Sequence, residues 1–458
     1  MKKARREPKP DTPRMHLRLT LAACVLASSM AFIDGTVLTV ALPALRRDFA
    51  ADYALLQWVM NGYTLAVAAL TMIGGALSDR YGHARILSLG CLLFSLASAA
   101  CALAPDIGWL IAARVTQGIA AAMVAPSSLA LIGSAFPRSE RSAAIGVWAA
   151  ASAIAAGGAP VLGGWLTEVL GWRFIFWINP PIGLFAIALL YFAPKDRMEK
   201  RRFDLAGAFL LALSLAAIAY ALGQIGPGEK GMEAPRAPAS IIIAVAIAGL
   251  ALLGVYAWWQ KTTEHPLTPP RLLKNEPFVG LNLATLGIYG ALAVGFFLLP
   301  FEMIDRRNLS ATDVGLVFVP FTLAIGLLSR AFGKLADRYG ARMPLIVGPL
   351  GCAASFLWLA AGQGMPTWLG IFAPVCLTGL SMAVLVAPLT SAVMSSLKDA
   401  DEGLASGVNN AAARIASLLG VALAAGLASF ASSYVFGMIT AAALAASGAL
   451  TAALTLKR

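Results

Sequence analysis

The chain has 458 residues, of which 59% are hydrophobic and 13% are charged, with a formal net charge of +12. A soluble domain carries about 25% charged residues, so this chain has too little polar material to cover a core of its size in water. Its cations lie in short segments between apolar blocks, which argues against nucleic acid as a partner. The composition excludes an ordinary soluble protein and indicates the lipid bilayer as its solvent.

The apolar blocks are each about 20 residues long, the length that a helix needs to cross about 30 Å of hydrocarbon. Fourteen membrane-spanning helices are predicted, over residues 19–43, 54–77, 86–104, 108–132, 143–167, 174–193, 205–225, 240–259, 278–300, 311–329, 345–362, 368–393, 404–429 and 433–455. The first block is long, contains Asp34 and lacks a clear cleavage site, so we interpret residues 1–18 as a retained cytoplasmic basic tail.

The distribution of cations predicts the orientation, because cytoplasmic loops carry an excess of Lys and Arg. With the N-terminus inside, 26 of the 35 Lys and Arg residues fall in cytoplasmic segments and 7 in outer loops. The other two, Arg114 and Arg414, lie within predicted helices. We therefore expect a multi-pass protein of the cell membrane with both termini in the cytoplasm.

An internal repeat divides the chain into two halves. The segment GGALSDRYGHAR (74–85) returns as FGKLADRYGAR (332–342), and MVAPSSLALI (123–132) returns as LVAPLTSAVM (385–394). Parallel repeats of this kind are typical of major facilitator transporters, whose substrate site lies between the halves. We expect an all-α integral membrane protein with a six-helix bundle at 19–193, an inserted helix pair with linkers at 194–277, and a second six-helix bundle at 278–458.

Asp34 is the leading functional candidate, because it lies far inside the first predicted helix. A charged carboxylate in hydrocarbon is costly, so such a group is expected to bind and release protons or to meet a cation. Arg114 also lies inside a helix, and a buried arginine needs a carboxylate or carbonyl partners. Two interpretations stay open: proton coupling through Asp34 and Arg114, or a purely structural pair of the two.

Two further motifs indicate moving parts. The repeated DRYG loop joins a helix end to a turn glycine and is interpreted as a cytoplasmic gate rather than an ordinary charged loop. Its candidate residues are Gly75, Asp79, Arg80, Gly82, Arg85, Asp337 and Arg338. The segment AIAAGGAPVLGG (153–164) is rich in small residues and contains Pro160, which permits close helix packing and a bend.

Substrate contacts are expected from aromatic and polar residues within the helices, although aromatic residues in membrane helices more often face lipid. The candidates are Trp58, Tyr63, Gln117, Trp148, Tyr289, Phe296 and Asn409. We expect no catalytic residues, no metal site and no cofactor. The sequence contains no phosphate-binding G-x-x-x-x-G-K-[ST] motif, so an ion gradient is expected to supply the energy.

Several segments together resemble the fourteen-helix drug:proton antiporter family of the major facilitator superfamily, over essentially the whole chain. IDGTVLTVALPAL (33–45) is similar to the first-helix signature, GALSDRYGHAR (75–85) to the gating loop and ARVTQGIAAA (113–122) to a fourth-helix motif associated with proton coupling. The resemblance implies a role for Asp34 in proton or cation handling. It also implies an antiporter motif at Gly146, Pro160, Gly163 and Gly164, although Ala155 and Ala159 stand where that motif has glycines.

We therefore expect a proton-driven exporter of small organic compounds, amphipathic or cationic, that functions as a monomer in the lipid bilayer. A dedicated exporter of a metabolite, siderophore or amino acid would have the same fold. A receptor without transport is a third possibility, and the lack of any sizeable soluble domain argues against it.

Overall fold

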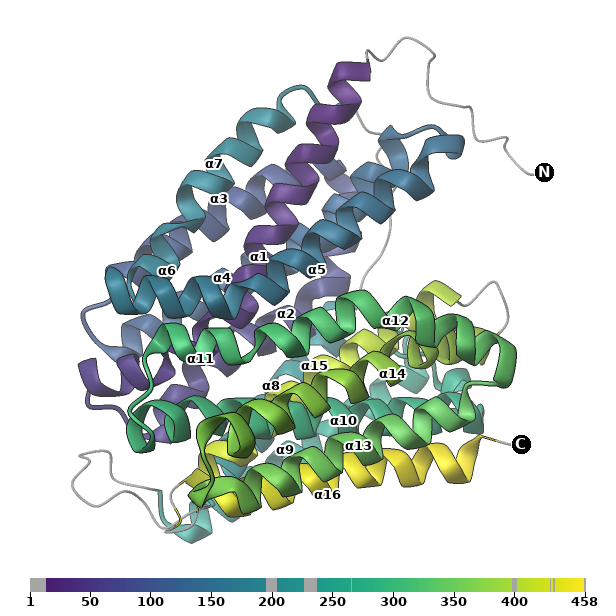
Figure 1. Cartoon of the computed structure of the whole chain (residues 1–458). Coiled ribbons are helices and arrows are strands. Elements are labelled where there is room, and N and C mark those ends of the chain that lie inside the picture. The colour runs from purple at the N-terminus through teal and green to yellow at the C-terminus, as the bar shows by residue number, and fades with distance from the viewer. Residues whose placement is uncertain are drawn as a thin grey trace.

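The computed structural model describes residues 14–194, 204–225, 237–264, 266–397, 402–428, 430 and 433–456, and these residues form helices joined by short loops, with no strand among them (Figure 1). Thirteen of these helices are long and apolar enough to cross a membrane. The shorter apolar stretch Phe174–Leu190 corresponds to the remaining predicted block. The expected all-α membrane architecture is confirmed. Of the proposed tail, residues 1–18, the first 13 lie outside the described residues.

The N-terminal half contains the first six spans. Its helices are α1 (Arg14–Asp48), α2 (Tyr53–Tyr81), α3 (His83–Ala102), α4 (Ile107–Ala135), α5 (Arg138–Val169), α6 (Phe174–Trp177) and α7 (Asn179–Leu190). Side chains of Asp52 and Asp106 accept hydrogen bonds from the backbone N–H groups of Leu55 and Trp109, which caps the starts of α2 and α4.

The sequence predicts one helix for the sixth span, whereas the structure divides it into α6 and α7. The break at Ile178 comes just before Pro180 and Pro181, which have no N–H to continue the hydrogen-bond pattern of α6. Both prolines instead occupy the first turn of α7, where that N–H is not needed.

The C-terminal half contains the last six spans. Its helices are α10 (Glu276–Phe301), α11 (Ala311–Val317), α12 (Val319–Tyr339), α13 (Arg342–Ala361), α14 (Ala373–Ser395), α15 (Glu402–Ala428) and α16 (Ser433–Thr455). Short π-helical turns at Glu302–Arg306 and Trp368–Phe372 extend α10 and precede α14.

The inserted pair consists of α8 (Leu205–Gly223) and α9 (Ala239–Thr262). Asp204 links α8 to α9, because its carboxylate accepts hydrogen bonds from the Gly207 backbone N–H of α8 and from the side chains of Trp259 and Gln260 of α9. Leu215 and Ala219 of α8 pack against Leu418 of α15 in a cluster that also includes Leu65 of α2. Helix α8 therefore covers a seam between the two halves, and α9 packs on α8.

The two halves meet at one end of the molecule. In Figure 1 their helices converge on the left, while the first turn of α1 lies at the top and the last turn of α16 at the right, away from that convergence. At the convergent end Arg46 forms an ion pair with Asp305 (3.7 Å), and the Thr312 N–H donates to the Glu168 carboxylate (3.1 Å). We call this the closed end, and the opposite end the terminal end.

Candidate functional site

Asp34 lies at the centre of a buried polar network in the N-terminal half. Its side chain is essentially inaccessible, and its Oδ2 accepts a hydrogen bond from Arg114 Nη1. Its Oδ1 accepts hydrogen bonds from Gln117 Nε2 (2.8 Å) and Asn179 Nδ2 (3.1 Å). The carboxylate therefore joins α1 to α4 and α7 with one full ion pair and two neutral donors, which together offset the cost of burying its charge.

The guanidinium of Arg114 has several partners besides Asp34. Nη1 also donates to Gln117 Oε1 (2.7 Å), and Nε donates to the backbone carbonyl of Val59 (3.1 Å). The Tyr63 ring lies under the guanidinium, with its centroid 4.4 Å away, in cation–π geometry. Arg114 therefore stays held by α2 and α4 even when the Asp34 contact is removed.

Asn179 is a member of this network that the sequence analysis did not single out. Its Nδ2 donates to Asp34 and also to Ser98 Oγ (2.9 Å), while the Ser98 hydroxyl donates to the Phe176 carbonyl at the end of α6 (2.8 Å). The segment WRFIFWINPPIG (172–183) contains a signal that could have identified Asn179. An amide side chain that stands in an apolar segment, directly before two prolines, indicates a polar group at a break in a helix.

The small residues of the proposed antiporter motif pack α5 against both halves. A Cβ at Gly163 would lie 2.6 Å from a methyl carbon of Val37 in α1, and a Cβ at Gly164 would lie 2.2 Å from the Ala311 carbonyl oxygen in α11. A Cβ at Gly315 of α11 would likewise lie 2.4 Å from the Pro160 carbonyl oxygen. Gly146 differs from these, because a Cβ there would meet nothing within 4 Å. Close approach at the closed end thus explains three of the four motif positions.

The two DRYG loops have the same local structure. Gly82 and Gly340 adopt φ of +100° and +90°, and their N–H groups donate to the carbonyls of Ser78 and Ala336, which ends α2 and α12. Arg80 stacks on Tyr81, and Arg338 stacks on Tyr339 at the same 5.3 Å. The other candidates lie around these turns: Gly75 faces Pro126 of α4, Arg85 and Asp337 are exposed, and Asp79 is half-buried.

The proposed substrate contacts do not all gather around Asp34. Tyr63 and Gln117 belong to its network. Trp148 lies in α5, where its indole N–H donates to Ser28 Oγ (2.9 Å). The remaining candidates are separate from that network: Phe296 packs edge-on against Phe318 and Phe321, Asn409 donates to Thr285 Oγ1 (2.7 Å), and Tyr289 and Trp58 are half-buried on α10 and α2.

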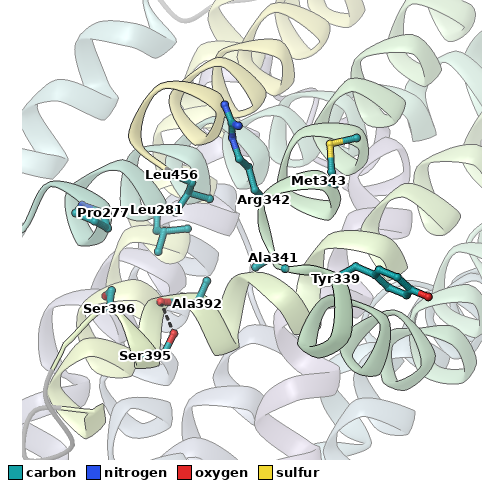
Figure 2. Close-up of a pocket in the computed structure, with 11 residues that line it drawn as sticks. Pro277, Leu281, Tyr339, Ala341, Arg342, Met343, Ala392, Ser395, Ser396 and Leu456 are labelled. Atoms are coloured by element: carbon teal, nitrogen blue, oxygen red, sulfur yellow. Dashed lines mark hydrogen bonds between the residues drawn. The ribbon is translucent and has the colours of Figure 1, made fainter. Parts of the chain in front are cut away.

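A cavity of about 590 Å³ lies elsewhere, at the terminal end of the C-terminal half (Figure 2). Tyr339, Arg342 and Met343 of the second DRYG loop and the start of α13 line it, facing Leu281 of α10 and Leu456. The Arg342 guanidinium donates to the Ala453 carbonyl (3.1 Å). None of the residues of the Asp34 network borders this cavity, so we do not assign it to the transported compound.

Comparison with known proteins identifies the family. A sequence profile of the Major Facilitator Superfamily matches residues 24–297 and again residues 278–458. The chain belongs to the Major Facilitator Superfamily. It is a transporter by family and not an enzyme.

Relatives within this superfamily are named for drug resistance. The chain is 32% identical over 410 residues to the multidrug resistance protein Stp of Mycobacterium tuberculosis, covering 88% of this chain and 74% of that protein. It is also 32% identical over 414 residues to the puromycin resistance protein pur8 of Streptomyces alboniger, covering 88% and 80%.

Solved structures share the fold at low sequence identity. A bacterial homologue of the human lysosomal transporter Spinster, described as inward-facing and unoccupied, superposes with a TM-score of 0.68 at 16% identity, covering 98% of this chain and 97% of that one. The peptide transporter POT in complex with sulfate gives a TM-score of 0.69 at 16% identity, covering 95% and 93%. These likenesses confirm the major facilitator fold.

Proposed function

We propose that this protein is a proton-coupled antiporter that exports small amphipathic organic compounds across the cell membrane. In this proposal it functions as a monomer with both termini in the cytoplasm, as the excess of cations on that side favours. Relatives named for multidrug, puromycin and lincomycin resistance support a drug-like cargo.

The observation that carries the proposal is the Asp34 carboxylate in its buried network. Three donors from two other helices converge on its two oxygens. A proton on Asp34 would neutralise the carboxylate and weaken its attraction for Arg114, which keeps the Val59 carbonyl and the Tyr63 ring as partners. Protonation therefore has a defined structural consequence: the link from α1 to α4 loosens while Arg114 stays in place.

A loosened α1 would act on the contact between the halves. Val37 lies one helical turn beyond Asp34 and packs on Gly163 of α5, and the adjacent Gly164 packs on Ala311 of α11. Thr36 also donates to the Ala156 carbonyl of α5 (3.1 Å). Movement of α1 relative to α4 would thus be transmitted through α5 to the C-terminal half, which is the coupling that alternating access requires.

We infer that the closed end faces outward, so that the present conformation gives access from the cytoplasm. Export then requires the Arg46–Asp305 and Glu168–Thr312 contacts to break and the DRYG loops at the terminal end to come together as a gate. One proton moved inward across 100 mV supplies about 2.3 kcal/mol, enough for a concentration ratio of roughly 50.

Transport of a fluorescent dye into inverted membrane vesicles under an imposed pH gradient tests the proposal. Asp34→Asn keeps the side-chain shape but cannot ionise, and we expect it to lose gradient-driven uptake while still binding the dye. Glu140→Gln, which removes an exposed carboxylate at the start of α5, is the matched control and should transport normally. Normal gradient-driven uptake by the Asp34→Asn protein would remove this residue from the mechanism.

A narrower cargo range is a second candidate. Several relatives are named for a single compound, among them the lincomycin resistance protein of Streptomyces lincolnensis and the tetracenomycin C resistance and export protein of Streptomyces glaucescens. A susceptibility screen in a strain without its own efflux pumps distinguishes the two: protection against chemically unrelated compounds favours multidrug export, and protection against one scaffold favours a dedicated exporter.

A further inference from the structure

Arg414 is a second arginine within the membrane-spanning part of the protein, and the Asp34 network does not use it. It lies near the middle of α15, 12 residues from its first residue and 14 from its last. An arginine in hydrocarbon is costly unless it faces a partner or a water-filled cavity. Its place at mid-membrane depth therefore calls for a polar partner or for a cavity that water can enter.

The side of α15 that carries Arg414 is turned toward the N-terminal half. One turn further along, the Leu418 carbonyl accepts a hydrogen bond from Asn61 of α2 (3.1 Å). The Arg414 guanidinium is close enough to Tyr63 for a Coulombic interaction, and Tyr63 is the residue whose ring supports Arg114. Arg414 thus lies at the contact between α2 and α15, which are adjacent elements of the two halves (Figure 1).

Toward the terminal end this side of α15 becomes open. Arg414 is half-buried, Asn410 one turn away is exposed, and a Cβ at Gly407 would meet nothing within 4 Å. Contacts between α15 and α2 therefore close the helix surface from Arg414 toward Leu418. The surface from Arg414 toward Asn410 stays accessible. This is the arrangement expected for a residue reached from the terminal end.

No protein group described in the structure neutralises Arg414. Within the described ranges it has neither an ion pair nor a hydrogen bond, and the buried carboxylate of the N-terminal half, Asp34, is already paired with Arg114. The internal repeat, in the register that matches Gly146 to Gly407, places Ala153 at the equivalent position of α5. The cation is therefore specific to one half and is not required by the shared architecture.

We propose that Arg414 binds an acidic group, a carboxylate in the simplest case, of the transported compound. The fork of N–H donors on a guanidinium matches a carboxylate in two parallel hydrogen bonds. This assignment rests on the proposed transport function, and it narrows the expected amphipathic or cationic cargo to an organic acid or a zwitterion.

Matched pairs of ligands test the assignment. Fluorescence polarisation of the purified full chain in detergent, without any gradient, measures the binding of tetramethylrhodamine, which carries a free carboxylate, and of its methyl ester. A set of aromatic carboxylic acids and their methyl esters then competes for the same site. We expect the acids to bind about tenfold more tightly than the esters, the range of a charge-assisted hydrogen bond.

The variants identify the group responsible. Arg414→Gln should remove the preference for acids, and Arg414→Lys should retain part of it, since a point charge remains without the fork. Lys261→Gln, which removes an exposed cation at the end of α9, is the matched control and should keep the full preference. Asp34→Asn should also keep it, so a failure of proton coupling is distinguishable from a failure of this assignment.

A measurement on the unmodified chain guards against a variant that does not fold. Phenylglyoxal modifies accessible arginines, and mass spectrometry quantifies its adduct at Arg414. The acids should protect Arg414 from modification and their esters should not. The proposal is overturned if no acid is preferred over its ester, if Arg414→Gln keeps the preference, or if acids and esters protect Arg414 equally.

Discussion

A single methyl group at Gly164 should force the closed end of the transporter apart. The added Cβ of Gly164→Ala would lie 2.2 Å from the Ala311 carbonyl oxygen, where ordinary contact begins at 3.4 Å. The obstacle is backbone and cannot rotate away, so α11 must retreat from α5 by about 1 Å or the conformation must change.

The expected size of the effect follows from overpacking, which costs about 1–3 kcal/mol in a well-packed contact. If that cost falls only on the conformation in which α5 and α11 touch, the ratio of the two conformations shifts by about 5- to 150-fold. The matched control is Gly146→Ala on the same helix, where a Cβ meets nothing within 4 Å. Any general effect of alanine on the helix is shared by both variants.

Spin labels at the exposed positions Leu170 and Leu316, in a background with the five native cysteines replaced by alanine, report the separation by double electron–electron resonance. We expect the Gly164→Ala distance distribution to gain a longer component that the Gly146→Ala protein lacks. Identical distributions in both variants and in the parent would refute the idea that this contact holds the halves together.

Three further outcomes follow from local contacts. Asn179→Ala should lower the free energy of unfolding by about 1 kcal/mol in the parent but by less in an Asp34→Ala background, a double-mutant cycle that isolates their hydrogen bond; equal losses in both backgrounds would contradict the contact. Gly340→Ala should cost about 1–3 kcal/mol because of its φ of +90°, whereas Gly326→Ala in an open helical position should not lower the melting temperature. Asp204→Ala should destabilise the packing of α9 on α8, seen as faster hydrogen exchange at the start of α8, and unchanged exchange there would argue against the cap.

Much of the fold could be predicted from the sequence, because lipid imposes a simple rule on it. Every spanning segment must be an apolar helix of about 20 residues, so block length and cation placement were enough to define fourteen spans. The repeated DRYG loop and its glycines likewise predicted a pair of equivalent turns, and Gly82 and Gly340 share one backbone geometry.

Partners across helices could not be read from the sequence. Arg114 was named as one possible partner of Asp34, but the contributions of Asn179 and Ser98 depend on where the Pro180–Pro181 break turns the chain. That break is a local property of two residues, whereas its direction is decided by packing against α3 and α1.

The sequence by itself determined that this is a helical membrane protein built from two related halves, since hydrophobic length and internal repetition are properties of the chain alone. Only the tertiary structure decided that Asp34 is ion-paired, that Gly163 and Gly164 join three helices, and that Arg414 is left without a counter-charge in the described part of the chain. The physical reason is that neutralisation of a buried charge depends on distances of a few Å between side chains far apart in sequence, and helix packing alone sets those distances.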